Sequence, residues 1–150
     1  MGEELGPSCL ASRLFLFDEN VTPIGRALRA VYPTQVAVSQ DVPELGRGAD
    51  DEIHVIPWLL ERNAVWVTQD WHRYRNREQA RWLHSQGVSV AWFRLSGVRA
   101  LRVEGFLVVG AKAMPKLIRA YEAPGVRYYT VDANGAITEL NVERLLRGRI

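Results

Sequence analysis

Short apolar runs alternate along this chain with longer segments in which apolar residues recur every three or four positions. The short runs are rich in Val, Phe and Trp, which is typical of buried strands. The longer segments predict helices with one apolar face. Strands that alternate with helices form βαβ units around a parallel sheet, so the pattern predicts an α/β fold. The predicted strands span residues 13–17, 35–38, 65–68, 88–93, 126–131 and 136–140.

Residues that commonly cap helices mark three helix starts. Thr22 before Pro23 predicts an N-cap with proline at the first helical position. Asn76 predicts the cap of a helix that Gly87 ends, and Asp50 is placed to cap the helix between these two. The first predicted helix follows Thr22, and the others span residues 51–62, 77–86 and 98–121.

The spacing of apolar residues predicts which side of the first two helices packs against the sheet. Pro57 interrupts the second helix, so a kink or an early break is expected there. The predicted inward residues are Ile24, Ala27, Leu28 and Val31 in the first helix, and Ile53, Ile56, Leu59 and Leu60 in the second.

The two ends of the chain differ in character. Residues 1–12 show no periodicity and predict a flexible leader, so residues 13–150 are expected to form a single domain. Near the other end, Asn134-Gly135 lies between two strand-like runs and is a strong short-range signal for a β-hairpin. We therefore expect a C-terminal helix followed by a hairpin added at the edge of the sheet.

Composition narrows the class of protein. The chain has 150 residues, of which 47% are hydrophobic and 24% charged, as in an ordinary globular domain. The single cysteine, Cys9, excludes an internal disulfide framework and a multi-cysteine zinc site, and we expect a cytoplasmic location. No apolar stretch approaches the length of a membrane span, so no membrane partner is expected. The 19 basic residues are mostly Arg, whose planar fork matches phosphate oxygens, which permits a nucleic-acid partner.

Three aspartates lie at boundaries between loops and predicted elements: Asp18, Asp50 and Asp70. In a doubly wound sheet, Asp18 and Asp70 would project from the rim at the carboxyl ends of the strands, where ligands commonly bind. Convergent carboxylates repel each other unless a hard cation neutralises them, and Mg²⁺ and Mn²⁺ prefer such ligands. Two simpler interpretations compete with a metal site. Asp50 and Asp51 suit the amino end of a helix without any ion, and Asp70 suits a loop residue that caps the next helix.

A basic segment follows Asp70. Four arginines in this segment could grip the phosphates of a ligand beside the acids. The alternative for each arginine is a solvated helix face. The candidate RNA-binding residues are Arg73, Arg75, Arg77 and Arg81.

Three short motifs occur in order: Leu-Phe-Asp-Glu-Asn at residues 16–20, Asp-Asp-Glu-Ile at 50–53 and Val-Thr-Gln-Asp at 67–70. Together they resemble the PIN-like nucleases, and more narrowly the small bacterial group related to VapC-type toxin ribonucleases. The resemblance covers residues 13–95, and it depends on the order and spacing of the three motifs rather than on any one of them.

The resemblance implies a three-layer sandwich around a central, mainly parallel sheet, an acidic Mg²⁺ or Mn²⁺ site, and metal-dependent cleavage of RNA. By position, Asp18 matches the first acid of the family, Asp50 or Asp51 the second, and Asp70 the third. The resemblance also implies a toxin of a toxin–antitoxin pair, with an antitoxin protein as partner and a homodimer as the candidate assembly.

One position departs from the family pattern. Many relatives carry an aspartate where this chain has His72, and histidine suits Mg²⁺ poorly. Three alternatives follow: Glu78 supplies the missing carboxylate, the metal site is weaker, or activity is lost. His72 itself is either a ligand, since histidine can bind Mn²⁺, or an ordinary surface residue. Glu19 is a further acid, but its side chain is expected to leave on the side opposite Asp18 if the strand continues that far.

Two other functions compete with a ribonuclease. The first is a catalytically weak or inactive PIN-like module that binds RNA or protein. The second is a nucleotide-binding doubly wound domain, which is less favoured because the chain has neither Gly-x-Gly-x-x-Gly after its first strand nor a Walker-type Gly-Lys-Ser/Thr.

Overall fold

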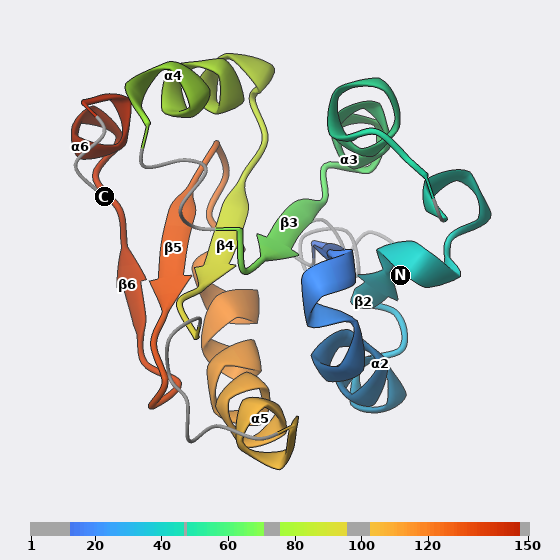
Figure 1. The fold of residues 1–150 in the computed structure, drawn as a ribbon. Coiled ribbons are helices and arrows are strands. Elements are labelled where there is room, and N and C mark those ends of the chain that lie inside the picture. Colours follow the sequence, from blue (N-terminus) through green and yellow to red (C-terminus); the bar gives the residue numbers. More distant parts are fainter. Residues whose placement is uncertain (1–12, 47, 71–75, 96–102, 148–150) are drawn as a thin grey trace, which may run out of the picture.

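The computed structural model describes residues 13–46, 48–70, 76–95 and 103–147, so the predicted leader at residues 1–12 lies outside the described residues. Six strands form one sheet in the order β2-β1-β3-β4-β5-β6. The first five strands in chain order run parallel, and β6 pairs antiparallel with β5 at the edge (Figure 1). The strands are β1 (Phe15–Phe17), β2 (Val36–Val38), β3 (Val65–Thr68), β4 (Val90–Phe93), β5 (Tyr128–Val131) and β6 (Ile137–Glu139).

Helices cover both faces of the sheet, which confirms the predicted α/β sandwich. Figure 1 shows α2 and α5 on one side of the sheet and α3, α4 and α6 on the other. Among the described helices, none is both long enough and apolar enough to cross a membrane. The α-helices are α2 (Thr22–Val31), α3 (Ile56–Arg62), α4 (Arg77–Gln86), α5 (Val103–Ala120) and α6 (Val142–Leu146). Shorter turns are η2 (Glu19–Val21), η3 (Ser39–Asp41), η4 (Pro43–Leu45) and the π-helical η5 (Asp51–Val55).

The central strands have no polar face, because successive side chains point alternately into the two apolar cores on opposite faces of the sheet. Phe15 and Phe17 of β1 pack in the core under α2 and α5, whereas Leu16 packs in the core under α3, α4 and α6. All three side chains are fully buried. A strand covered by helices on both faces is expected to be apolar throughout, as the sequence of β1 is.

The predicted cap and end of α4 and the predicted C-terminal hairpin are confirmed. The Asn76 side chain accepts a hydrogen bond from the Glu78 N–H, and Gly87 ends α4 in the left-handed conformation. The C-terminal hairpin is also present: Gly135 takes a positive φ of 79° in a short loop that Asp132 closes. The helix α6 was not predicted, although Asn141 caps it in the same way.

The predicted inward face of the second helix was wrong at two positions. Ile53 and Leu60 are 70% and 49% exposed, whereas Val55 and Trp58 are buried. The cause is the π-helical turn η5, which is wider than an α-helical turn and shifts the residues that face the sheet. Pro57 lies in the first turn of α3, directly after η5, so the regular α-helix is interrupted just before the proline, as predicted.

The first helix is also rotated from its predicted orientation. Ala27 and Val31 are exposed, and the buried side of α2 is formed by Thr22, Ile24, Gly25 and Leu28. Thr22 is the first helical residue rather than the N-cap, because η2 precedes it. The rotation places Gly25 against β1: a Cβ atom at this position would lie 2.7 Å from Phe17 Cβ. Only glycine permits this close approach of helix and strand.

We therefore expect Gly25→Ala to destabilise the protein by about 1–3 kcal/mol, because overpacking a buried contact outweighs the better helix propensity of alanine. The reverse change at an exposed position of the same helix, Ala27→Gly, is the control and should cost about 1 kcal/mol from propensity alone. Urea unfolding monitored by circular dichroism measures both. A Gly25→Ala variant as stable as the wild type would show that α2 does not approach β1 so closely.

Candidate acidic pocket at the carboxyl ends of the strands

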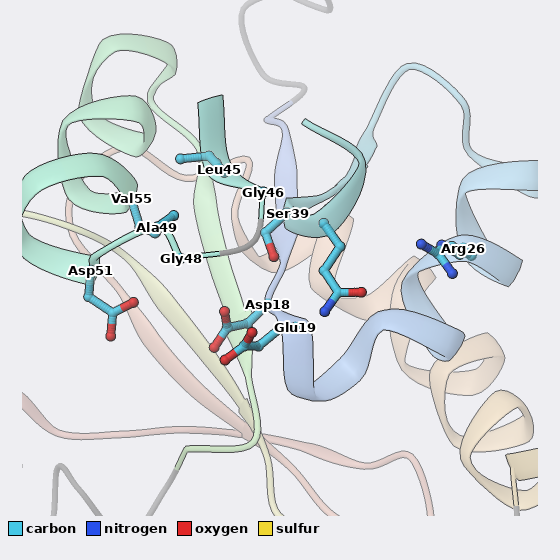
Figure 2. A pocket seen from close by; sticks show the side chains of 11 residues that line it. Asp18, Glu19, Arg26, Ser39, Leu45, Gly46, Gly48, Ala49, Asp51 and Val55 are labelled. Atoms are coloured by element: carbon cyan, nitrogen blue, oxygen red, sulfur yellow. The ribbon is translucent and has the colours of Figure 1, made fainter. Parts of the chain in front are cut away.

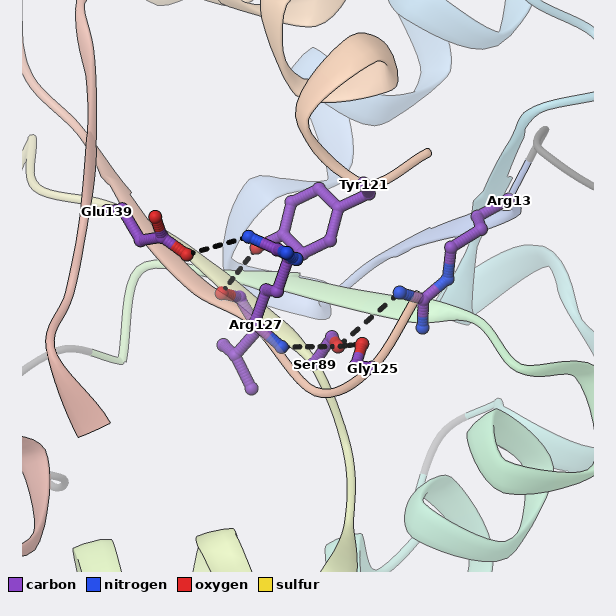
Figure 3. Close-up of polar contacts among 7 residues, drawn as sticks. Arg13, Ser89, Tyr121, Gly125, Arg127 and Glu139 are labelled. Carbon is purple, nitrogen blue, oxygen red and sulfur yellow. Dashed lines mark hydrogen bonds and ion pairs between the residues drawn. The ribbon is translucent and has the colours of Figure 1, made fainter. Parts of the chain in front are cut away.

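A pocket of about 490 Å³ opens where β1 and β2 end (Figure 2). The strand order changes direction between β1 and β3, because α2 follows β1 on one side of the sheet and α4 follows β3 on the other. The pocket lies beside this switch point, at the carboxyl ends of parallel strands, where ligands commonly bind. The pocket is lined by residues after β1, by α2, by η3 after β2 and by the segment from Leu45 to Val55.

Asp18 directly follows β1 and is half-buried at the base of this pocket. Thr68 donates a hydrogen bond from Oγ1 to Asp18 Oδ2 at 3.1 Å. Burial raises the pKa of Asp18 to about 6, and hydrogen bonds from the Glu19 backbone and from Thr68 oppose this shift. The negative charges of Asp51 and Glu19 raise the pKa further. Asp18 is therefore an acid whose charge is costly in the folded protein.

Thr68 links the ends of β1 and β3. Its side chain is fully buried, and Oγ1 accepts hydrogen bonds from Asn20 Nδ2 at 3.2 Å and from the Asp70 N–H at 3.0 Å. Asn20 Oδ1 in turn accepts from the Gln69 N–H at 3.1 Å. Asp18 and Asp70 therefore follow adjacent parallel strands at the same rim, as predicted. The role of Asn20 was not predicted. The only signal in the sequence is an amide side chain two residues after Asp18, the acid that follows the strand.

The second acid at the pocket is Asp51. Asp51 is half-buried and lines the pocket, whereas Asp50 is exposed and is not among the described lining residues. Asp50 Oδ1 accepts a hydrogen bond from the Ile53 N–H at 3.0 Å, which satisfies a free N–H group at the start of the helix. The structure thus supports the capping interpretation for Asp50 and brings Asp51 toward Asp18.

Glu19 also lines the pocket, beside Asp18. Figure 2 shows the two side chains directed into the same space. The expectation that they leave on opposite sides required the strand to continue, but β1 ends at Phe17 and Glu19 begins the 3-10 turn η2. Alternation between the two faces of a sheet applies only within a strand.

The remaining predicted residues are not brought into the described lining of the pocket. Asp70 is half-buried beyond β3, and Glu78 is exposed in the first turn of α4. Arg77 and Arg81 are exposed on the same helix. Three predicted site residues, His72, Arg73 and Arg75, lie outside the described residues.

Sequence reasoning missed three polar residues of the pocket. Arg26 comes from α2, and Ser39 and Gln40 come from η3. None of them belongs to a motif with a characteristic spacing. Arg26 reaches the pocket on the helix that follows β1, whereas Ser39 and Gln40 reach it because β2 lies beside β1 in the sheet.

The donor set suits an open cation site rather than a closed one. Among the described residues, no three His, Cys, Asp or Glu side chains lie close enough together to hold a metal ion. Mg²⁺ in proteins often keeps several waters and uses only one or two carboxylates together with phosphates of the substrate. The pair of Asp18 and Asp51, whose charges act on each other, fits that kind of site.

Comparisons with known proteins give no information on the chemistry of the pocket. No family model, curated protein or solved structure matches this chain. The acids, the buried threonine and the position at the rim of the sheet are therefore the observations that bear on function.

The raised pKa of Asp18 predicts how stability depends on pH. Between the unfolded value of 3.8 and the folded value of about 6, the folded protein binds more protons than the unfolded chain, so stability falls as pH rises through this window. Asn cannot ionise, so Asp18→Asn should be more stable than the wild type above pH 6, by about 1–3 kcal/mol. The difference in stability between Asp18→Asn and the wild type should disappear below about pH 4, where Asp18 is protonated in both the folded and the unfolded wild type.

Urea unfolding in EDTA, repeated across this pH range, measures the effect. The control is Asp50→Asn, which keeps an acceptor for the Ile53 N–H and leaves the pocket unchanged. A difference between Asp18→Asn and the wild type that does not vary with pH would contradict a perturbed Asp18.

Thr68→Val should destabilise the protein by about 1–3 kcal/mol, because it keeps the shape but leaves the partners of Oγ1 without a hydrogen bond. Thr68→Ser keeps the hydroxyl and is the matched control; it should lose only the contacts of one methyl group, about 1 kcal/mol. Thermal unfolding compares the two. Equal losses in both variants would show that the hydroxyl contributes nothing beyond packing.

Proposed function

We propose that this chain is a Mg²⁺- or Mn²⁺-dependent ribonuclease that resembles the PIN-like nucleases. The observation that carries the proposal is the acidic pocket, in which Asp18, Glu19 and Asp51 gather at the carboxyl rim of a parallel sheet. The three motifs that suggested the family each supply a residue at or beside this rim: Asp18, Asp51 and Thr68.

The acids favour a divalent cation as the partner of the pocket. Burial is the largest cause of the raised pKa of Asp18, and the negative charges of Asp51 and Glu19 add to it, because a like charge nearby disfavours the ionised form. Asp18 and Asp51 are the residues that would hold the ion. When bound, such an ion activates water and stabilises the charge that develops at phosphorus during phosphodiester hydrolysis.

The other residues of the rim have structural tasks in this proposal. Thr68 holds the Asp18 carboxylate in one orientation through its buried hydroxyl, and Asn20 holds Thr68. Because both partners are fixed by strand pairing, the carboxylate is placed before any ligand binds. The exposed Arg77 and Arg81 on α4 are candidates for contacts with RNA phosphates farther from the pocket.

The main alternative is a module with this fold that binds RNA or protein without cleaving it. It differs from a ribonuclease in one measurable property, which is metal-dependent hydrolysis. A cognate antitoxin and a homodimer stay predictions of the family resemblance.

Cleavage of a fluorescent single-stranded RNA tests the proposal, with Mg²⁺, with Mn²⁺ and with EDTA. Asp18→Asn and Asp51→Asn should each reduce the rate at least about 100-fold, because each removes a charge that holds the ion. Asp50→Asn is the matched control, since it lies next to Asp51, keeps the helix cap and does not line the pocket. Its rate should stay near that of the wild type.

The results separate the competing interpretations. Purified wild type that binds RNA but shows no metal-dependent cleavage would favour the binding module. An Asp50→Asn variant as inactive as Asp51→Asn would assign the second acid to Asp50 and contradict the geometry of the pocket. Cleavage that survives in EDTA would contradict a metal-dependent mechanism.

A further inference from the structure

An arginine stands in the wall of the acidic pocket. Of the described residues that line the pocket, Arg26 alone carries a positive charge. Figure 2 shows Arg26 on one side of Asp18 and Glu19, with Asp51 on the other side. The pocket is therefore acidic at its base and toward η5, and basic toward α2.

The guanidinium group of Arg26 is held in a defined orientation. Nε donates to Asp41 Oδ2 at 3.1 Å, and Nη2 donates to Asp41 Oδ1 at 2.9 Å. This paired arrangement fixes the plane of the guanidinium group more firmly than a single contact would. Asp41 belongs to η3, so the ion pair also ties α2 to the segment that follows β2.

Arg26 keeps donors for a ligand despite this ion pair. A guanidinium group has five N–H donors, and the two bonds to Asp41 use only part of them. The side chain of Arg26 is 52% exposed, so the remaining donors are accessible from solvent. Arg29 Nη1 contacts Asp41 Oδ2 at 2.9 Å, so two arginines share one carboxylate and the local charge remains positive.

The acids on one side of the pocket and Arg26 on the other could bind successive phosphates of one nucleic-acid strand. Acids at the base of the pocket repel a phosphodiester chain, and a nearby cation reduces this repulsion. A planar guanidinium group also matches two phosphate oxygens. The pocket volume of about 490 Å³ lies in the range of small-ligand pockets, and the polar residues Ser39 and Gln40 also line the pocket. With a scissile phosphate at the acids, a neighbouring phosphate would lie toward α2.

We propose that Arg26 binds the RNA phosphate next to the one that is cut, and that it thereby fixes where along the strand cleavage falls. This inference rests on the proposed ribonuclease function and adds a residue that sets the cleavage position. Asp41 acts as a positioning residue, because it orients the guanidinium group and does not itself contact the RNA.

The test compares Arg26→Gln with Arg29→Gln. Each variant removes one cation paired with Asp41, but only Arg26 lines the pocket. The first measurement is the dissociation constant of a single-stranded RNA oligonucleotide in EDTA over a series of salt concentrations. Arg26→Gln should weaken binding about tenfold. It should also reduce the salt slope by about 0.7, the value for one phosphate contact to a single strand. Arg29→Gln should reduce the slope by clearly less, because Arg29 does not line the described part of the pocket, and Arg26→Lys should restore most of the slope.

The second measurement identifies the phosphate. Oligonucleotides that carry one uncharged methylphosphonate are compared, with the substitution moved along the strand from the cleavage position. At one neighbouring position, the substitution should weaken binding to the wild type about tenfold and leave binding to Arg26→Gln unchanged. With Mg²⁺ present, Arg26→Gln should also cut at several adjacent positions where the wild type cuts at one.

The outcomes separate this inference from the proposed function. If the wild type cleaves RNA and Arg26→Gln has the salt slope and cleavage position of the wild type, the role of Arg26 is wrong while the ribonuclease stands. If the wild type shows the Arg26-dependent slope but never cleaves, the phosphate contact stands and the ribonuclease does not. Equal loss in Arg26→Gln and Arg29→Gln, or wild type that does not bind RNA, would overturn the inference.

Discussion

The burial of β1 between two cores is the constraint on which the rest of the structure depends. This strand pairs with β2 along one edge and with β3 along the other, and none of its three side chains is accessible to solvent. A strand in this position obliges the chain to cross to one side of the sheet and then to the other, which produces the three layers. It also means that the first polar side chain after the strand, that of Asp18, emerges at the meeting point of both layers, where it stays half-buried.

The register between β1 and β3 determines the neighbours of that carboxylate. Phe17 pairs with Val67, so the residues that follow each of them, Asp18 and Thr68, lie side by side. The Asp18 N–H donates to the Val67 carbonyl at 2.8 Å, which fixes the backbone, and the Thr68 hydroxyl fixes the side chain. A shift of the register by one residue would turn the threonine to the other face of the sheet and leave Asp18 without this partner.

The pocket combines groups that oppose each other electrostatically. Burial and the charges of Asp51 and Glu19 make the Asp18 carboxylate costly to ionise, whereas Arg26 at the side of α2 is neutralised only in part by Asp41. An arrangement of this kind contributes little to stability, because the acids repel and the exposed ion pairs are screened by solvent. Such an arrangement of charges is easier to explain if the pocket binds a cation at the acids and a phosphate at Arg26.

Much of the architecture was determined by the sequence alone. The helix α4 with its Asn76 cap and the turn at Gly135 arise from interactions within a few residues, and both were predicted. The strand β3 was predicted from its run of apolar residues, although its pairing partners are distant in the chain. The α/β class and the shared rim of Asp18 and Asp70 were also predicted, because alternating strands and helices admit few topologies.

The tertiary structure decided which side chains meet. The wide turn of η5 exposes Ile53, the 3-10 turn after β1 directs Glu19 into the pocket beside Asp18, and Asp51 rather than Asp50 lines the pocket. Arg26 joins them from α2, and Ser39 joins them because β2 lies beside β1. The physical reason is range: caps and turns act through hydrogen bonds between near neighbours in the chain. Membership of a pocket depends on strand order, register and the pitch of each turn, which are set by packing across the whole domain.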